Sequence, residues 1–385
     1  MNNTTEKRIL LLVDDDSQNI QVVHSILKDN YKIRVAMNGI TALELAKVEP
    51  LPDLILLDVM MPQMDGYTVC RHLKADPRTR DTPVIFLTGK TEVSDETRGF
   101  EVGAVDYIHK PFSPPIVTAR VRTHLMLRDA HRTVARQLLT LSSELEMAQQ
   151  VQRSILPRET PKLSGLDIAA RYIPMSSVAG DFYDFIVVDE KHVGILIADV
   201  SGHGLSSALI ASMLQTALAA QSPRASHPAE VLSGLNKALY GKFQSYFVTA
   251  AYLFVDMNTG TVQYAGAAHP PLLLWRARSH EAIECLENGL MLGPFAHATY
   301  STLVLSLEKG DRIVLITDGI VETVDTSENE FGMDRLKQMV ESQHDLPADR
   351  FADALLERLT KFSERAMGAS QSDDITLLVI DLKNN

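Results

Sequence analysis

The chain has 385 residues, 45% of them hydrophobic and 22% charged, and a formal net charge of −12 at pH 7. This length allows two domains with separate cores, and the acidic balance argues against a general nucleic-acid surface. No apolar run reaches the roughly 18 residues that a membrane span needs, and the first apolar stretch meets acidic residues too soon for a signal peptide. Cys70 and Cys285 lie far apart without metal-ligand spacing, which suits a reducing compartment. We therefore expect a cytoplasmic protein.

Short apolar runs alternate with helical patterns over the first 126 residues. Five strands are predicted at residues 9–13, 32–36, 54–59, 84–88 and 105–109. The first, third and fourth are almost continuously apolar, as expected for parallel strands that are covered on both faces. Alternating strands and helices predict a doubly wound α/β sheet, in which sites form at the carboxyl ends of the strands.

Acidic and polar residues occur at these strand ends. Asp14 and Asp15 follow the first strand, Asp58 ends the third, Thr88 ends the fourth and Lys110 follows the fifth. The three acids can bind Mg²⁺, and an aspartate beside that ion can attack phosphorus. The lysine would neutralise phosphoryl oxygens and the threonine hydroxyl would bond to one of them. A proline follows the lysine, which allows a cis peptide bond there. Each residue alone could equally be structural, but their joint order is specific.

The motifs VDDD, LLDVMMP, LTG and DYIHKPF occur in that order. They resemble the receiver domain of bacterial two-component response regulators over roughly residues 6–126. The resemblance implies Asp58 as the phosphate acceptor, with a sensor histidine kinase as donor. Thr88 and Lys110 match the switch residues of that family, and Tyr107 matches the aromatic residue that reorients on phosphorylation. The Mg²⁺ ligands that the resemblance implies are Asp14, Asp15, Asp58 and the carbonyl of Met60.

A long amphipathic helix is predicted between residues 114 and 157, which contain no glycine and no proline between Pro115 and Pro157. Apolar residues recur mostly at three- and four-residue spacings, at Val134, Leu138, Leu141, Leu145, Ala148 and Ile155. About three heptads of such a seam favour a coiled coil and a homodimer. The alternative is a simple spacer with a solvated, charged surface. The predicted domains are 1–126, the helical linker 127–157, and 158–385.

Strands and clustered helices are predicted over the remainder of the chain, which indicates an α+β domain with helices over a two-sheet core. The strands are expected at 167–174, 182–189, 192–200, 247–256, 261–267, 302–307, 311–317 and 375–381. A hairpin turn is expected at Asn258-Thr259-Gly260. The helices are expected near 204–220, 228–243, 333–341 and 347–365.

Four motifs in this region carry an aspartate at a strand end or beside glycine: AGDFYD, ADVSGHG, ITDGIVE and SDDITLL. Asp181, Asp199, Asp318 and Asp373, if they converge, would bind two divalent cations that clamp a phosphate and lower the pKa of a shared water. All-oxygen ligation indicates Mg²⁺ or Mn²⁺ and not zinc.

A nucleophile pair of His203 with Ser201 or Ser206 is a weaker alternative, because the segment lacks the G-x-S-x-G elbow. A serine before a helix more often caps it. His269 is interpreted as a turn or packing residue.

The four acidic motifs resemble the PPM-type metal-dependent Ser/Thr protein phosphatases, and within them the SpoIIE/RsbU-like branch. The resemblance covers about 220 residues and implies a β-sandwich flanked by helices. By this resemblance Asp199 bridges two metals, Val200 offers its carbonyl, Asp181 serves the second metal, and Asp318 and Asp373 complete the first. The sequence departs from the family at Ala179, where glycine is common, and the neighbouring Asp374 fits the motif position less well than Asp373.

Together these resemblances imply a response regulator whose output is hydrolysis of phosphoserine or phosphothreonine on a partner protein, by direct attack of water and without a phosphoenzyme. By family analogy the partner is a STAS-type anti-sigma factor antagonist. One alternative is a non-catalytic adaptor that binds a sigma factor or antagonist through a PPM-like fold. A DNA-binding regulator is a further alternative, weakened by the negative charge and by the missing helix-turn-helix motif.

Overall fold

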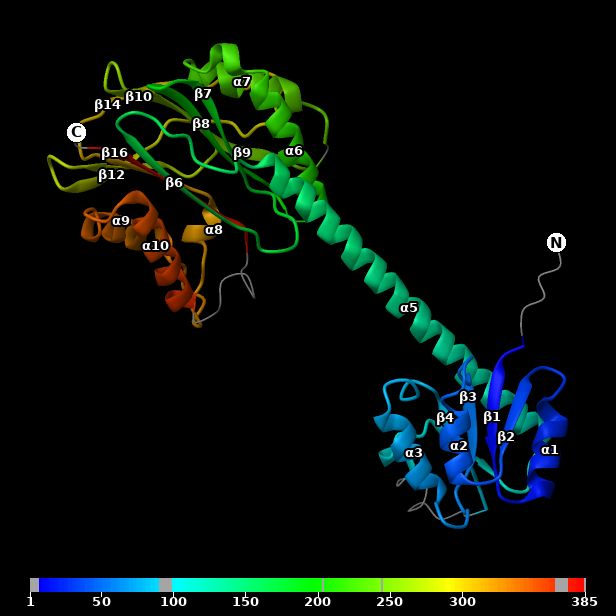
Figure 1. Cartoon of the computed structure of the whole chain (residues 1–385). Coiled ribbons are helices and arrows are strands. Elements are labelled where there is room, and N and C mark those ends of the chain that lie inside the picture. The colour runs from blue at the N-terminus through cyan, green and yellow to red at the C-terminus, as the bar shows by residue number, and fades with distance from the viewer. Residues whose placement is uncertain (1–6, 90–98, 203, 244, 364–372, 384–385) are drawn as a thin grey trace. The chain divides into compact units, whose positions relative to one another are not determined.

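The computed structural model describes residues 7–89, 99–202, 204–243, 245–363 and 373–383. The chain divides into two compact units, Met1–Thr140 and Leu141–Asn385, each with its own sheet structure and core (Figure 1). Among the described residues, no helix combines the length and the apolar character that crossing a bilayer would demand.

The first unit is built on a five-stranded parallel sheet with the order β2-β1-β3-β4-β5. The strands are β1 (Ile9–Val13), β2 (Lys32–Ala36), β3 (Leu54–Asp58), β4 (Val84–Thr88) and β5 (Asp106–His109). The helices are α1 (Ser17–Leu27), α2 (Gly39–Leu45), α3 (Gly66–Ala75) and α5 (Pro114–Ile155). Every residue of β1, β3 and β4 is buried, because α2 and α3 cover one face while α1 and the first part of α5 cover the other. The doubly wound fold predicted from the sequence is confirmed.

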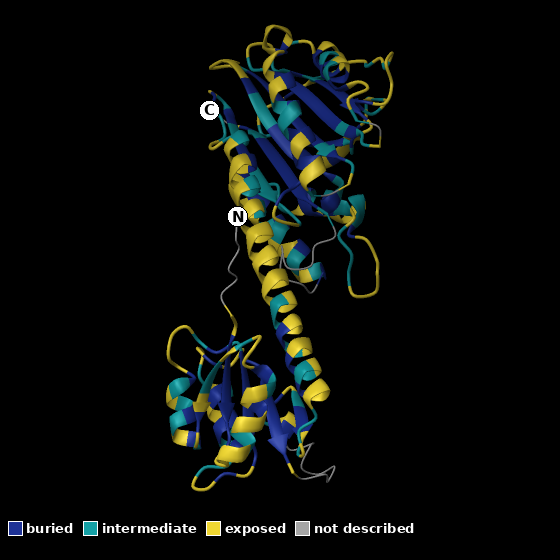
Figure 2. Ribbon diagram, turned by 90° about the vertical axis from the view of Figure 1, so that its right-hand side faces the viewer, coloured by how far each residue is buried: buried dark blue, intermediate teal, exposed yellow. Residues whose placement is uncertain are grey.

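Helix α5 begins within the first unit and runs into the second. Its first part buries Val117, Val121 and Leu125 against the sheet. Arg128 Nη1 then contacts Asp53 Oδ1 at 2.9 Å. From residue 126 to residue 151, a fully described stretch, every residue is exposed or of intermediate burial (Figure 2). The helix ends at Ile155, as the following proline predicts.

The second unit contains two mostly antiparallel sheets, with the orders β13-β10-β9-β8-β7 and β12-β11-β15-β16-β6, and β14 pairs with β10. The first sheet comprises β7 (Phe182–Asp189), β8 (His192–Val200), β9 (Val248–Asp256), β10 (Thr261–Ala267), β13 (Asn288–Gly289) and β14 (Leu303–Ser306). The second comprises β6 (Leu166–Ile173), β11 (Leu272–Arg276), β12 (Glu281–Cys285), β15 (Arg312–Ile316) and β16 (Ile375–Leu382). The helices are α6 (Leu205–Ala219), α7 (Pro228–Leu239), α8 (Asp318–Val321), α9 (Gly332–Ser342) and α10 (Ala348–Ser363).

One apolar core lies between the two sheets. A second core joins the first sheet to α6 and α7, and a third joins the other sheet to α8, α9 and α10. The unit is therefore a β-sandwich flanked by helices, as predicted. Four short elements, β11, β12, β13 and the single-turn helix α8, were not predicted from the sequence.

Candidate phosphoacceptor and phosphatase sites

The predicted acids of the first unit meet at the carboxyl ends of β1 and β3. Asp14 and Asp58 are buried, with 0% and 4% of their surface exposed, whereas Asp15 is exposed. Carboxylate oxygens of the three residues lie within 4.8 Å of one another. Lys110 Nζ lies 2.9 Å from Asp14 Oδ2 and 3.0 Å from Asp58 Oδ2. The parallel sheet thus brings these four side chains to one edge.

Burial raises the pKa of Asp58, and the neighbouring carboxylate of Asp14 raises it further, while Lys110 and the backbone N–H of Met60 oppose the shift. Burial lowers the pKa of Lys110, but its bonds to the two aspartates prevail and the net shift is upward. The lysine is therefore a cation at neutral pH, and the excess of negative charge with all-oxygen donors fits Mg²⁺. The Lys110–Pro111 peptide bond is cis.

The predicted switch residue Thr88 and the predicted reorienting aromatic residue Tyr107 are both buried. Thr88 ends β4 with 3% of its surface exposed, and Tyr107 in β5 has 4% exposed. The Tyr107 ring contacts Phe86 and Phe100, with ring centroids 5.6 and 5.3 Å apart. The aromatic side chain is thus held inward by packing against two other rings.

In the second unit, acids from separate segments converge. Asp199 lies near the end of β8, Asp318 begins α8 and Asp373 precedes β16. Carboxylate oxygens of Asp318, Glu322 and Asp373 lie within 4.8 Å of one another. Burial raises the pKa of Asp199 to about 8, with added repulsion from Asp318 and Asp373. Burial likewise raises the pKa of Asp318 to about 6, with repulsion from Asp373 and Glu322.

This cluster fits the divalent cations that the resemblance implies. Its donors are carboxylate oxygens, which suit Mg²⁺ or Mn²⁺. Asp318 Oδ1 is buried and finds no hydrogen-bond partner within the part of the chain that the structure describes. A buried carboxylate oxygen without a donor is costly, and a bound cation would remove that cost.

Two threonine hydroxyls fix the carboxylate of Asp181 by hydrogen bonds. Its Oδ2 atom accepts hydrogen bonds from Thr317 Oγ1 at 2.8 Å and from Thr376 Oγ1 at 2.6 Å. Burial, and then the charge of Asp199, raise the pKa of Asp181. Thr317 precedes α8 and Thr376 lies in β16. The two hydroxyls therefore tie the Asp181 loop to the segments that carry the other acids.

The Asp181 loop also lies directly against the end of β8. A Cβ atom placed on Gly180 would lie 2.7 Å from the carbonyl oxygen of Val200, so only glycine allows this approach. Asp374 accepts hydrogen bonds from the backbone N–H groups of Met175 at 2.7 Å and Gly180 at 2.6 Å. Asp374 thus secures the loop, while its neighbour Asp373 faces the acidic cluster.

Sequence reasoning missed Glu322, Thr317 and Thr376. Glu322 carried a usable signal, because it follows Asp318 by four residues and so lies on the same face of a helical turn. The threonines carried none, since they meet Asp181 only through the fold.

The alternative nucleophile pair gains no support. His203 lies outside the described residues, and Ser201 Oγ accepts a hydrogen bond from the backbone N–H of Phe247 at 3.0 Å. His269 is buried and bonds through Nδ1 to Thr249 Oγ1 at 2.9 Å. Burial lowers the pKa of His269 to about 3, which agrees with a neutral packing residue.

Two family models match separate parts of the chain. The model described as "Response regulator receiver domain" matches residues 10–122, and "Stage II sporulation protein E (SpoIIE)" matches residues 189–383. The phosphoserine phosphatase RsbU of Bacillus subtilis is 31% identical over 261 residues, which are 67% of this chain and 76% of RsbU.

Further similarities concern one domain at a time. A probable cyclic di-GMP phosphodiesterase of Vibrio cholerae is 48% identical over 116 residues, 30% of this chain and only 26% of that protein. The SiaA-PP2C domain of Pseudomonas aeruginosa aligns with a TM-score of 0.57 at 23% identity, over 65% of this chain and 100% of that one, which shows the fold. The chain belongs to the SpoIIE family, and it joins a response regulator receiver domain to a PPM-type protein serine/threonine phosphatase domain.

Proposed function

We propose that this chain is a response regulator that is phosphorylated on Asp58 and removes phosphate from phosphoserine or phosphothreonine on a partner protein. The observation that carries the proposal is the convergence of Asp199, the α8 pair Asp318 and Glu322, and Asp373 from three separate segments of the second unit. RsbU is described as a phosphoserine phosphatase, which supports phosphoserine as the substrate group.

In the receiver, the Asp58 carboxylate attacks the phosphorus of a phosphohistidine on a sensor kinase. The P–N bond breaks, an acyl phosphate forms on Asp58, and the released imidazole takes up a proton. Lys110 already contacts the acceptor carboxylate and neutralises the transferred group, while Thr88 donates a hydrogen bond to it. Asp14 and Asp15, with Asp58 and the Met60 carbonyl, would hold Mg²⁺.

In the phosphatase domain, the residues that would hold two Mn²⁺ or Mg²⁺ ions are Asp181, Asp199, the Val200 carbonyl, Asp318 and Asp373. When bound, such ions polarise a phosphate and lower the pKa of the attacking water. Water attacks phosphorus, the bond to the serine or threonine oxygen breaks, and that hydroxyl leaves with a proton.

The partner we propose is a STAS-type anti-sigma factor antagonist, so that dephosphorylation alters sigma-factor availability. We also propose a homodimer through α5. Large apolar side chains of the predicted seam are exposed on this helix, including Val134 at 53%, Leu138 at 61% and Leu141 at 53%. A second α5 helix would cover them.

Phosphate release from a phosphorylated STAS protein and from a chromogenic phosphate ester, measured with Mn²⁺, tests the output. Asp199→Ala and Asp318→Ala should abolish hydrolysis, whereas Asp345→Ala, at a side chain that is 94% exposed, should not. Hydrolysis that survives both active-site changes would refute the metal mechanism, and its absence in the unaltered protein would favour the adaptor. Acetyl phosphate should change the rate of the unaltered protein and have no effect on Asp58→Ala.

A further inference from the structure

Gln152 occupies an unusual position on α5. After Leu125 it is the only buried residue of this fully described helix, with 6% of its surface exposed. A buried glutamine must place both the carbonyl oxygen and the NH₂ group of its side-chain amide in hydrogen bonds to offset the loss of water.

The NH₂ group and the carbonyl oxygen of the Gln152 side chain both form hydrogen bonds to the backbone of one residue, Ala179. Gln152 Nε2 donates to the carbonyl oxygen of Ala179 at 2.6 Å, and Gln152 Oε1 accepts from the N–H of Ala179 at 3.0 Å. Ala179 is fully buried and lies outside any strand. The Gln152 side chain therefore forms the hydrogen bonds to the N–H and C=O of Ala179 that a neighbouring strand would form in a sheet.

The bonded backbone leads directly into the phosphatase site. Gly180 is the next residue, and its N–H donates to Asp374 at 2.6 Å. Asp181 follows, with one carboxylate oxygen bonded to the hydroxyls of two threonines. Gln152 from the helix and Asp374 from the segment before β16 thus hold two successive peptide groups, and Asp181 is placed by them.

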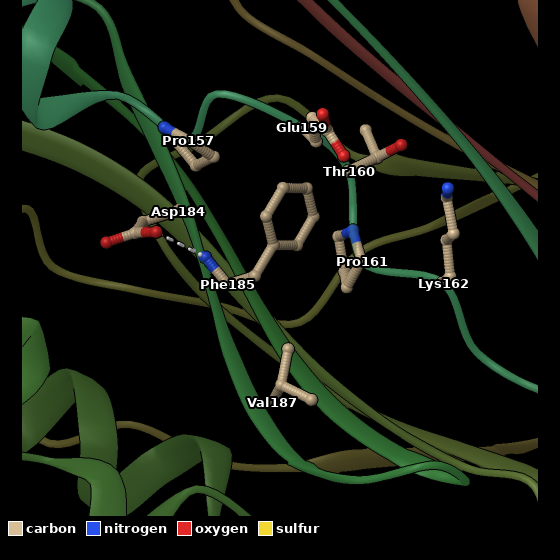
Figure 3. Close-up of a pocket in the computed structure, with 8 residues that line it drawn as sticks. All are labelled: Pro157, Glu159, Thr160, Pro161, Lys162, Asp184, Phe185 and Val187. Atoms are coloured by element: carbon tan, nitrogen blue, oxygen red, sulfur yellow. Dashed lines mark hydrogen bonds between the residues drawn. The ribbon is translucent and has the colours of Figure 1, made fainter.

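The end of α5 is fixed to the phosphatase domain around this contact. Gln215 Nε2 of α6 donates to the carbonyl oxygen of Ile155 at 3.3 Å. The chain that leaves the helix then crosses β7, where a cavity of about 500 Å³ lies between residues 157–162 and the strand. Figure 3 shows the Phe185 ring among Pro157, Thr160 and Pro161.

Gln152 also continues the seam of the helix. Leu138 and Leu145 precede it at successive intervals of seven residues, so the three side chains lie along one stripe of a coiled coil. The predicted seam passed from Ala148 to Ile155, and the position between them is Gln152. Any rotation or shift of paired α5 helices would move this glutamine.

We propose that Gln152 is a positioning residue that transmits the placement of α5 to the Asp181 loop and thereby sets the metal affinity of the phosphatase site. The transmission of receiver phosphorylation through Gln152 rests on the proposed function. The positioning of the loop does not.

The test uses the full chain with Gln152→Met, which keeps the length of the side chain and removes both hydrogen bonds, and with Gln152→Glu, which keeps the acceptor and loses the donor. Gln150→Met, at an exposed position of the same helix, is the matched control. Mn²⁺ affinity is measured by titration calorimetry, and protection of the Ala179 and Gly180 amides by hydrogen exchange.

We expect Gln152→Met to weaken Mn²⁺ binding by about 10- to 100-fold, the usual effect of losing an outer-shell partner, and to lose amide protection. Gln152→Glu should fall between Gln152→Met and the control. Unchanged affinity and protection in folded Gln152→Met would overturn the proposal, since a purely structural glutamine would lower stability without changing metal binding by the folded protein.

The response of phosphatase activity to acetyl phosphate tests whether Gln152 transmits receiver phosphorylation, separately from whether it positions the Asp181 loop. If the unaltered protein responds and Gln152→Met does not, the glutamine carries the signal. If both respond equally, transmission through Gln152 is refuted. If the unaltered protein itself fails to respond, the proposed regulation fails, and the calorimetric measurement alone decides whether Gln152 positions the loop.

Discussion

Replacing Asp199 by asparagine should stabilise the metal-free phosphatase domain at neutral and alkaline pH while abolishing its stabilisation by Mn²⁺. Burial, followed by repulsion from Asp318 and Asp373, raises the pKa of Asp199 from 3.8 to about 8. An acid whose pKa is higher in the folded chain binds more protons when folded. The contribution of Asp199 to the free energy of unfolding is therefore fully present below about pH 4 and is lost as the pH rises towards 8.

The raised pKa of Asp199 sets the size of the expected loss of stability. Each pKa unit corresponds to about 1.4 kcal/mol, so the metal-free domain should lose on the order of 4 kcal/mol between pH 5 and pH 8 through this residue. Asparagine carries no charge and escapes this loss. For a domain of this size, 1 kcal/mol corresponds to roughly 2–4 °C in Tm.

Urea unfolding in EDTA at pH 5 and pH 8 measures the difference. Trp275 is the sole tryptophan of the chain and is 3% exposed in the phosphatase domain, so its fluorescence follows that domain without a receiver signal. Added Mn²⁺ should raise the stability of the unaltered protein alone. Asp345→Asn serves as the control at an exposed carboxylate. The reasoning is refuted if Asp199→Asn differs from the unaltered protein equally at both pH values, or if it still gains stability from Mn²⁺.

Three further outcomes are expected at the same site. Thr317→Val and Thr376→Val each remove a hydroxyl donor from the buried carboxylate behind the site, so each should weaken Mn²⁺ binding by about 10- to 100-fold in calorimetry. Mn²⁺ affinity should rise between about pH 6 and pH 8, because Asp318 and Asp199, with pKa values of about 6 and about 8, must lose protons to bind the ion. Calorimetry in two buffers of different ionisation enthalpy would detect that release, and its absence would contradict the prediction. Glu322→Gln should weaken Mn²⁺ binding less than Asp318→Asn, because Glu322 is the exposed member of the cluster, and an equal loss would contradict that ranking.

The receiver fold was predictable because its central strands are covered on both faces. Burial on both sides makes a strand continuously apolar, and β1, β3 and β4 appear in the sequence as such runs. The strands β11 and β12 were missed although Leu272–Arg276 begins with an apolar run, because the polar turn that follows masks the hairpin. The helix α8 has four residues, too few to show a helical period.

The acids could be predicted, but the residues that hold them could not. Asp181 stands in a motif beside glycine, which marks it in the sequence. Thr317 and Thr376 are 59 residues apart and become partners only because β15 and β16 pair in the second sheet. Gln152 was not predicted, because it lies between the seam positions Ala148 and Ile155 and its role depends on a loop 27 residues further along the chain.

The bare middle of α5 has a consequence for how such chains can vary in length. Arg128 and Asp129 form ion pairs with Asp53 and Arg8, but no residue from 130 to 151 is buried, so an insertion in that stretch would not disrupt an apolar core. The rotational position of Gln152 about the helix axis is nevertheless fixed relative to the seam, because Leu138, Leu145 and Gln152 follow one seven-residue repeat. Adding or removing whole heptads would keep the glutamine aligned with the seam, whereas three or four residues would rotate it away. In the proposed dimer, we therefore expect the connection between the receiver and the phosphatase domain to accept a change of length by whole heptads but not a change that rotates one end of the helix relative to the other.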